Sequence, residues 1–306
     1  MKNHIPVLLN ESIDYLIQNN SGIYVDCTMG FGGHLEEILK KIKSNSKLIG
    51  IDKDISSFKY CKSKFHNDDR VVLYNTSFVN IDKIAKIELV DKIDGIFADL
   101  GVSSFQLDNL EEGFSYRFDS DLDLRMDKSS LLKASDVIMT QDEKTLADIF
   151  WKFGEERNSR LIARKIVESR KYSSIRTTFD LRKIVEESVP SRFLISTLSR
   201  IFQALRIYVN NELEELEILL KKSIDLLSKS GRLVLLSYHS LEDRIIKDIF
   251  KYEASDCVCP IETPICNCNK IKRIEIITKK PVVPTDEEIK NNNRARSAKL
   301  RVAKKL

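Results

Sequence analysis

The sequence predicts an α/β protein with a doubly wound, mostly parallel sheet and an inserted all-helical domain. Two observations support this fold class. Between residues 23 and 100, short apolar runs alternate with segments of helical periodicity. The next convincing strand begins about 130 residues after the fourth one, whereas a parallel crossover needs only about a dozen residues. The intervening stretch must therefore contain an insertion.

The first half of the sheet follows from four apolar runs and three helical segments. Alternation of strand and helix indicates βαβ units with right-handed crossovers, as in Rossmann-like folds. The predicted strands cover residues 23–29, 47–54, 70–77 and 92–100, and the predicted helices cover residues 35–43, 55–65 and 81–89.

The insertion has helical periodicity without strand runs. We predict a helical domain over residues 108–209, so that residues 1–107 and 210–306 form the main domain. Its helices are expected at residues 145–153, 155–171, 179–189 and 194–208. The return to the sheet is expected to be a helix at 211–229, a strand at 231–238, a helix at 241–250 and an edge strand at 274–278.

Composition places the chain among ordinary globular proteins. Of its 306 residues, 42% are hydrophobic and 31% are charged. No apolar run approaches the roughly 20 residues of a membrane helix, and no signal-peptide pattern follows Met1. These features predict a cytoplasmic protein without a membrane partner. The net charge of +4 neither requires nor excludes nucleic acid.

A glycine loop at residues 26–34 lies where the first strand meets the first helix. Its G-x-G-G spacing differs from the G-x-G-x-x-G pattern of dinucleotide folds. Asp26 in this loop would repel a pyrophosphate but suits an ammonium group. Asp52 ends the second strand and is placed for ribose hydroxyls, Phe78 follows the third strand and suits an adenine face, and Asp99 ends the fourth. Together these residues favour S-adenosylmethionine over NAD.

Eight segments resemble the RsmH (MraW) family of 16S rRNA cytosine-N4 methyltransferases. They occur in the family's order over nearly the whole chain, and one of them is Tyr238-His239-Ser240-Leu241-Glu242-Asp243-Arg244. The segments cover residues 4–9, 26–34, 99–108, 113–115, 122–127, 202–207, 231–244 and 294–301.

The resemblance implies a cofactor, a substrate and a set of site residues. The implied substrate is the exocyclic N4 of a cytidine in the decoding region of 16S rRNA (cytidine 1402 in ribosomal numbering), methylated within the small ribosomal subunit. The chain departs from the family at Asp121 and Asn293, where the family usually has proline. The implied S-adenosylmethionine site consists of Gly32, Gly33, His34, Asp52, Phe78, Asp99 and Gln106.

Transfer to a cytosine amine calls for a hydrogen-bond acceptor aimed at its N–H. Asp99 is one candidate, although contact with the cofactor is the interpretation that we favour for it. His239 is a candidate for base contact; packing at the strand end is the alternative, with Ser240 as the N-cap of the next helix. The carboxylates of an acidic loop at residues 121–127 are further candidates, but pairing with Arg125 is the expected explanation for that loop.

Two features near the C-terminus leave alternatives open. Cys257, Cys259, Cys266 and Cys268 form a compact cluster, for which zinc and no metal are equally favoured because both pairs are C-x-C rather than C-x2-C. Residues 291–306 carry six basic side chains and no acidic one. Contact with rRNA phosphates is slightly favoured for them over an anchoring role of Leu300 and Val302.

Three other functions compete with rRNA methylation. A DNA amino-methyltransferase would share the chemistry, but the Asp/Asn-Pro-Pro-aromatic loop of such enzymes is replaced by Asp99-Leu100-Gly101-Val102. A NAD-dependent oxidoreductase conflicts with the glycine spacing. A non-catalytic ribosome assembly factor that holds the cofactor stays open, as does the oligomeric state, including a homodimer.

Overall fold

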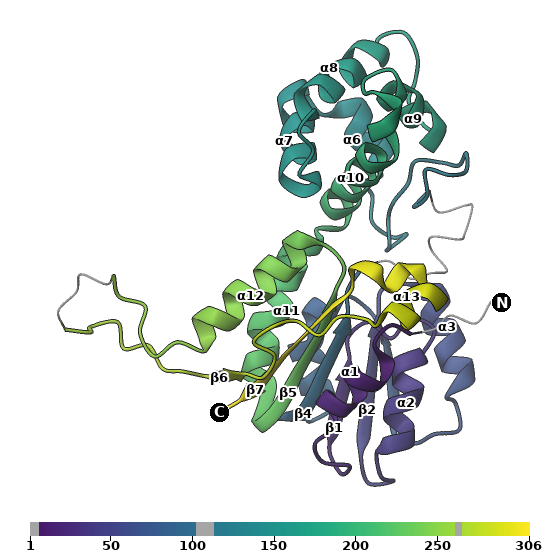
Figure 1. Cartoon of the computed structure of the whole chain (residues 1–306). Coiled ribbons are helices and arrows are strands. Elements are labelled where there is room, and N and C mark those ends of the chain that lie inside the picture. Colours follow the sequence, from purple (N-terminus) through teal and green to yellow (C-terminus); the bar gives the residue numbers. More distant parts are fainter. Residues whose placement is uncertain (1–5, 102–112, 261–264) are drawn as a thin grey trace. The chain divides into compact units, whose positions relative to one another are not determined.

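The computed structural model describes residues 6–101, 113–260 and 265–306 (Figure 1). The chain divides into two compact units. One consists of residues 1–101 and 213–306, and the other of residues 102–212. The sequence placed the corresponding boundaries at 107/108 and 209/210. None of the helices in the described ranges is long and apolar enough to span a membrane.

The first unit contains a seven-stranded sheet in the order β3-β2-β1-β4-β5-β7-β6. Strands β1 to β5 pair with one another in parallel. Strand β7 lies between β5 and β6 and runs antiparallel to both. The predicted doubly wound, mostly parallel sheet is thus confirmed. The strands are β1 (Ile23–Asp26), β2 (Lys47–Asp52), β3 (Val71–Asn75), β4 (Ile93–Asp99), β5 (Leu227–Ser237), β6 (Ile274–Ile276) and β7 (Lys299–Lys305).

Helices cover both faces of this sheet, so the alternating side chains of each strand enter two apolar cores. Tyr24 and Phe97 belong to the core formed with α1, α2 and α3. Val25 and Ile96 belong to the core formed with α4, α11 and α12 (Figure 1). The helical elements are α1 (Leu9–Leu16), α2 (Gly33–Lys41), α3 (Ile55–Lys64), η1 (Phe78–Asn80), α4 (Ile81–Ile87), α11 (Glu212–Leu226), α12 (Ser240–Glu253), α13 (Asp286–Asn291) and η2 (Asn293–Ser297).

The order of strands determines where a ligand can bind. From β1 the chain continues to β2 and β3 on one side of β1, whereas β4 lies on the other side. The strand order therefore reverses between β1 and β4. Ligands of open α/β sheets bind outside the carboxyl ends of the strands at such a point. Asp26 and Asp99 are the last residues of these two strands. The fold therefore places the glycine loop at the expected ligand position.

The basic C-terminal segment, residues 291–306, is largely part of the sheet, whereas its contact with rRNA phosphates stays a prediction. Leu300 and Val302 are fully buried in β7, and the strand pairs with both β5 and β6. Lys299 and Arg301 form ion pairs with Asp243 at 3.1 and 2.5 Å. Because the apolar side chains of β7 fill the core, the alternative of anchoring by Leu300 and Val302 is confirmed.

The second unit is built on one helical core. Its elements are α6 (Ala134–Thr140), α7 (Glu143–Gly154), α8 (Ser159–Ser169), α9 (Thr178–Glu186) and α10 (Ser191–Asn210). Gly154 permits close packing of α7 on α10, since a Cβ there would lie 2.6 Å from the carbonyl oxygen of Arg200. Helix α6 was not predicted. Within the described part of this unit the β-structure is a single bridge between Asp121 and Thr177.

Candidate functional site

The glycine loop after β1 is held by the carboxylate that ends β2. The backbone N–H of Gly30 donates to Asp52 Oδ2 at 2.8 Å, and the N–H of Asp54 donates to Asp52 Oδ1 at 2.8 Å. Gly32 has φ 77° and precedes the first turn of α2. A Cβ at Gly32 would lie 2.7 Å from the ring of Phe65, so this position requires glycine on two grounds.

Asp26 is the most unusual group in the loop because it is fully buried. Its Oδ1 accepts a hydrogen bond from Thr28 N at 3.1 Å, whereas its Oδ2 has no hydrogen-bond partner among the described residues. Burial, together with the nearby charges of Asp99 and Asp52, raises the pKa of Asp26 to about 8, against the lowering effect of the hydrogen bond from Thr28. Buried carboxylate oxygens are normally paired. An unpaired one therefore indicates a place for a cationic or donor group.

Asp52 and Asp99 make the same edge of the sheet anionic. Burial raises the pKa of Asp52 to about 6, against the lowering effect of the N–H groups of Asp54 and Gly30. Burial likewise raises the pKa of Asp99 to about 7, although the hydroxyl of Tyr238 lowers it. The charges of Asp52 and Asp99 both act on Asp26, so this edge disfavours a pyrophosphate and favours a ligand with positive charge.

Asp99 is surrounded by groups from three parts of the chain: the glycine loop, α2 and the residue after β5. The hydroxyl of Tyr238 donates to Asp99 Oδ1 at 2.7 Å, and the N–H of Asp99 donates to Thr28 Oγ1 at 2.6 Å. His34 Nδ1 lies 4.0 Å from Asp99 Oδ2. His34 Nε2 lies 3.2 Å from the carbonyl oxygen of Val7, which can only accept, so Nε2 carries a hydrogen. Sequence reasoning missed Tyr238, which precedes the candidate His239 directly.

His239 is the N-cap of α12, so the prediction of Ser240 as the cap is wrong. The N–H of Glu242 donates to His239 Nδ1 at 3.3 Å. Glu242 Oε2 in turn accepts from the N–H groups of Tyr238 and His239, at 2.9 and 3.3 Å. This reciprocal arrangement is a capping box. The largely buried His239 side chain thus has a structural role, and its contact with a base stays a prediction.

The other predicted cofactor residues lie at or near the same edge, with one outside the described residues. Phe78 begins η1, three residues after the end of β3, and is half-buried beside the α4 core. Gly33 is the first residue of α2, and a Cβ there would lie 2.5 Å from Pro6. Gln106 lies outside the described residues. The structure therefore brings together Gly32, Gly33, His34, Asp52 and Asp99.

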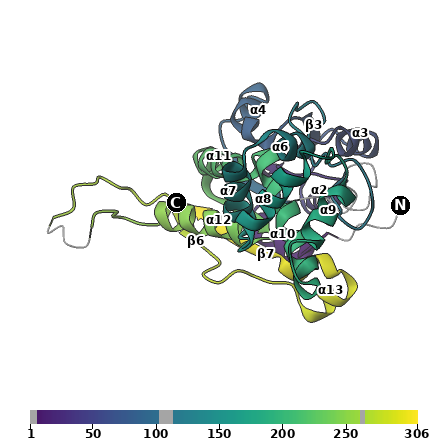
Figure 2. The same ribbon diagram turned by 90° about the horizontal axis from the view of Figure 1, so that it is seen from above.

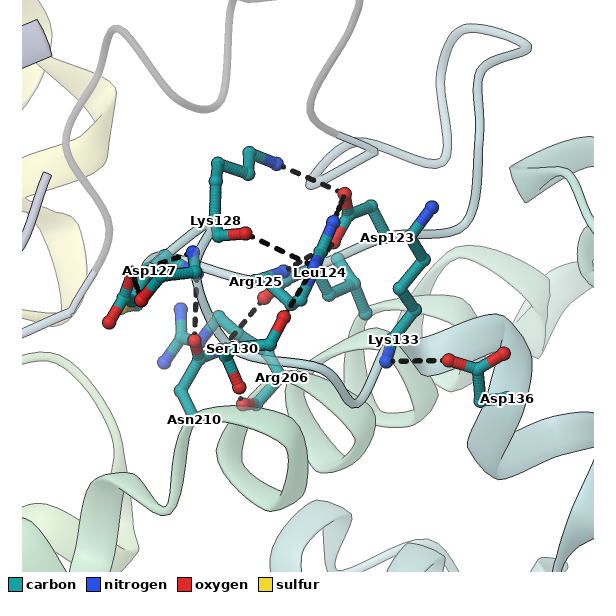
Figure 3. A network of polar contacts seen from close by, with 12 residues as sticks. Asp123, Leu124, Arg125, Asp127, Lys128, Ser130, Lys133, Asp136, Arg206 and Asn210 are labelled. Atoms are coloured by element: carbon teal, nitrogen blue, oxygen red, sulfur yellow. Dashed lines mark hydrogen bonds and ion pairs between the residues drawn. The ribbon is translucent and has the colours of Figure 1, made fainter. Parts of the chain in front are cut away.

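In the acidic loop of the helical unit, the carboxylates of Asp123 and Asp127 are bound by side chains and backbone groups of the same loop (Figure 3). Arg125 binds Asp123 through two hydrogen bonds of 2.6 and 2.9 Å, and Lys128 Nζ lies 3.3 Å from the same carboxylate. Burial raises the pKa of Asp123, but the bonds from Arg125 outweigh this effect and hold the pKa below its usual value. Asp127 accepts from the N–H and hydroxyl of Ser129. Pairing with Arg125 is thus confirmed for Asp123.

The aromatic side chains near this loop differ in exposure. Phe114 belongs to the helical core, and Tyr116 packs edge-on against Phe202 with ring centres 5.5 Å apart. Phe118 is exposed. Of the rings of Phe114, Tyr116 and Phe118, that of Phe118 is the one open to a base from solvent.

The four clustered cysteines lie between α12 and β6. Their sulfur atoms are within 4.8 Å of one another, and none of the four is in a disulfide. The glycine loop follows β1, in a different part of the unit. The cysteines therefore form a separate candidate site.

Comparison with known proteins assigns the chain to a family. The sequence pattern of the MraW methylase family matches residues 1–306. The chain belongs to the MraW methylase family. One relative of this MraW methylase is the ribosomal RNA small subunit methyltransferase H of Caldicellulosiruptor saccharolyticus, 48% identical over 100% of both chains. The protein of the same name from Fusobacterium nucleatum is 46% identical over 99% of this chain and 97% of its own.

A solved rRNA methylase structure from Streptococcus thermophilus aligns with 100% of this MraW methylase and 98% of its own chain, at 11% identity and a TM-score of 0.43.

Proposed function

We propose that this protein is a methyltransferase that uses S-adenosylmethionine to methylate 16S rRNA within the small ribosomal subunit. Its target is proposed to be the exocyclic N4 of the decoding-region cytidine numbered 1402. Membership of the MraW methylase family and the names of the relatives support the rRNA substrate. The observation that carries the cofactor assignment is the buried, unpaired Oδ2 of Asp26 beside the glycine loop.

The residues at the carboxyl edge of the sheet fit S-adenosylmethionine. Asp26 is suited to the ammonium of the methionine moiety, because Oδ2 needs a donor and the surrounding carboxylates favour positive charge. The oxygens of Asp52 each hold one backbone N–H and keep further lone pairs for ribose hydroxyls. Phe78 is suited to the adenine face. Gly32, Gly33 and His34 would line the rest of the site, and Gln106 is proposed to join them.

The bound cofactor supplies a methyl group already activated on a sulfonium, so the protein's tasks are orientation and proton transfer. The cytosine amine must lose a proton as its lone pair attacks. Oδ2 of Asp99 is suited to accept this proton, because Oδ1 is occupied by the hydroxyl of Tyr238. A pKa of about 7 makes Asp99 a competent base at neutral pH. Contact of Asp99 with the cofactor is the first role that we assign to it, and His239 is proposed to contact the base.

The helical unit, residues 108–209, is proposed to bind the RNA. Phe179 and Phe193 are exposed there. The guanidinium of Arg182 lies 5.5 Å from the ring centre of Phe179, and that of Arg192 lies 4.7 Å from that of Phe193. Aromatic and arginine surfaces of this kind stack unpaired RNA bases. Such surfaces suit a target cytidine that must leave its stack to be methylated.

Methyl transfer to ribosomal particles tests the proposed function. With radiolabelled S-adenosylmethionine, the full chain is expected to methylate small subunits or their late precursors far faster than naked 16S rRNA or duplex DNA. Mass spectrometry of nucleosides and of RNase fragments should locate N4-methylcytidine at the proposed position, and this signal should vanish in a strain without the gene. Equal or faster transfer to duplex DNA would instead identify a DNA amino-methyltransferase.

Asp52→Ala is expected to weaken cofactor binding by about 1–3 kcal/mol, or roughly 5- to 150-fold, because charge-assisted hydrogen bonds are removed. Isothermal titration calorimetry measures the change. Asp54→Ala is the matched control: Asp54 caps α3 through the N–H groups of Ser56 and Ser57, so its replacement should lower stability by about 1 kcal/mol and leave the affinity intact. Equal affinities for wild type and Asp52→Ala would exclude the ribose contact.

A further inference from the structure

The sulfur atoms of Cys257, Cys259, Cys266 and Cys268, here called the cysteine cluster, are spaced as metal ligands. The Sγ–Sγ distance is 3.5 Å between Cys266 and Cys268, and 3.9 Å both between Cys259 and Cys266 and between Cys257 and Cys268. A disulfide would require about 2.05 Å. Tetrahedral zinc with Zn–S bonds of about 2.3 Å sets its sulfur ligands about 3.8 Å apart. The observed spacing is close to this value.

The described part of the segment that carries the cysteine cluster has no hydrophobic core of its own. In both views the described residues between α12 and β6, 254–260 and 265–273, extend away from the sheet (Figures 1 and 2). Among its described residues, the apolar side chains of Val258, Ile265 and Ile271 are 45%, 81% and 76% exposed. A segment without a core needs a cross-link or a metal to bring four side chains together. In this segment the thiols converge while the apolar groups remain in solvent.

Backbone groups also face the sulfur atoms. The N–H of Val258 lies 3.5 Å from the Sγ of Cys268, and the N–H of Cys259 lies 3.4 Å from the Sγ of Cys257. N–H donation to sulfur supports thiolate ligands and orients them in metal sites. The base of the segment is closed, because the N–H of Arg273 donates to the carbonyl oxygen of Glu253 at 2.9 Å. Two Cys-x-Cys pairs are thus presented to each other from a fixed base.

We propose that the cysteine cluster binds one Zn²⁺ ion in a closed, structural Cys₄ site that folds this segment. Four thiolates fill a tetrahedral shell and leave no open position for water or substrate. The alternating Cys-x-Cys pattern suits this geometry because each pair supplies two ligands and the pairs face each other. A multinuclear iron–sulfur cluster would spread its cysteines over separate iron atoms and so separate their sulfur atoms further. The proposal is independent of the methyl transfer reaction.

Elemental analysis and cobalt substitution of the full chain test the site. Protein purified under reducing conditions without chelator is expected to contain close to one zinc per chain. Replacement of zinc by Co²⁺ should give the thiolate-to-cobalt charge-transfer absorption and the intense visible bands of tetrahedral cobalt. Both signals should disappear in Cys257→Ser/Cys268→Ser. The matched control Val258→Ser alters the same segment but keeps four thiols, and it should retain both signals.

Limited proteolysis gives a second readout. Trypsin should cleave near Lys270 and Lys272 much faster in the double variant, or after chelation, than in the zinc-loaded protein, while the melting temperature of the sheet unit should change little. Absence of metal together with absence of cobalt bands in the wild type would overturn the proposal. Stoichiometric iron in place of zinc would overturn it too, as would two disulfides in metal-free protein purified without oxygen.

Discussion

Asp26→Asn is expected to weaken S-adenosylmethionine binding by about 1.5–3 kcal/mol, roughly 10- to 150-fold, and to make the cofactor-free protein more stable at alkaline pH. The decrease in affinity follows from removing the charge that the proposed ammonium contact requires. The gain in stability follows from burial, because an ionised Asp26 Oδ2 has no partner among the described residues of the cofactor-free protein. A neutral amide avoids that cost.

The sign of the pH dependence follows from the pKa of Asp26, which is about 8 in the folded protein against a usual value of 3.8. The folded state binds the proton more tightly, so Asp26 favours folding most below pH about 4. That contribution declines as the pH rises and is gone above about 8. Wild type and Asp26→Asn should therefore have similar stabilities near pH 4, and the variant should be the more stable one at pH 8 and above. Wild-type cofactor affinity should rise with pH up to about 8.

Thermal melting and calorimetry between pH 4 and 9 measure both effects. Asp68→Asn is a matched control on the same unit, because hydrogen bonds from Arg70 hold the pKa of Asp68 below its usual value. Its replacement should lower stability at neutral pH and leave cofactor binding unchanged. If Asp26→Asn binds the cofactor as tightly as wild type, the ammonium contact is wrong.

The strands of the sheet could be predicted from the sequence where local patterns of apolar residues define them. The first four strands are continuous apolar runs in a regular alternation with helices, and the strand ends located Asp26, Asp52 and Asp99. Strand β7 was missed because Lys299 and Arg301 interrupt its apolar residues. Their charges are compensated by Asp243, which is 56 residues or more away along the chain. A contact between such distant residues leaves no local pattern.

The same limit applies to the site. Asp99 was found from its place at a strand end, but its partner Tyr238 is 139 residues away and resembles an ordinary buried aromatic in the sequence. The cap of α12 was assigned to Ser240 because serine is a frequent N-cap, whereas the backbone at His239 and the carboxylate of Glu242 form the observed capping box. Residue type and spacing identified the candidate groups, and only the fold determines which groups touch.

Truncation after Ala298, which removes residues 299–306, is expected to abolish the cooperative unfolding of the sheet unit. It deletes β7 from its position between β5 and β6, leaves Asp243 without its partners Lys299 and Arg301, and exposes the core that Leu300 and Val302 fill. The milder Leu300→Ala should destabilise the protein by about 2–5 kcal/mol. Circular dichroism melting and urea titration measure both, and a truncated chain that melts like wild type would show that β7 is dispensable.

A double variant, Arg294→Gln/Arg296→Gln, distinguishes a structural role of residues 291–306 from a role in RNA binding. Both arginines are exposed in η2, ahead of β7, so the melting temperature should stay close to that of wild type. If the two side chains bind rRNA phosphates, the slope of log affinity for small subunits against log salt should fall by about 0.7–0.9 for each arginine that binds a phosphate. Lys299 and Arg301 are paired with Asp243, and Lys304 is paired with Glu275. Lys305 donates to the carbonyl oxygen of Ile224. We therefore expect phosphate binding by this segment to be confined to Arg294 and Arg296. An unchanged slope would leave residues 291–306 with a structural role alone.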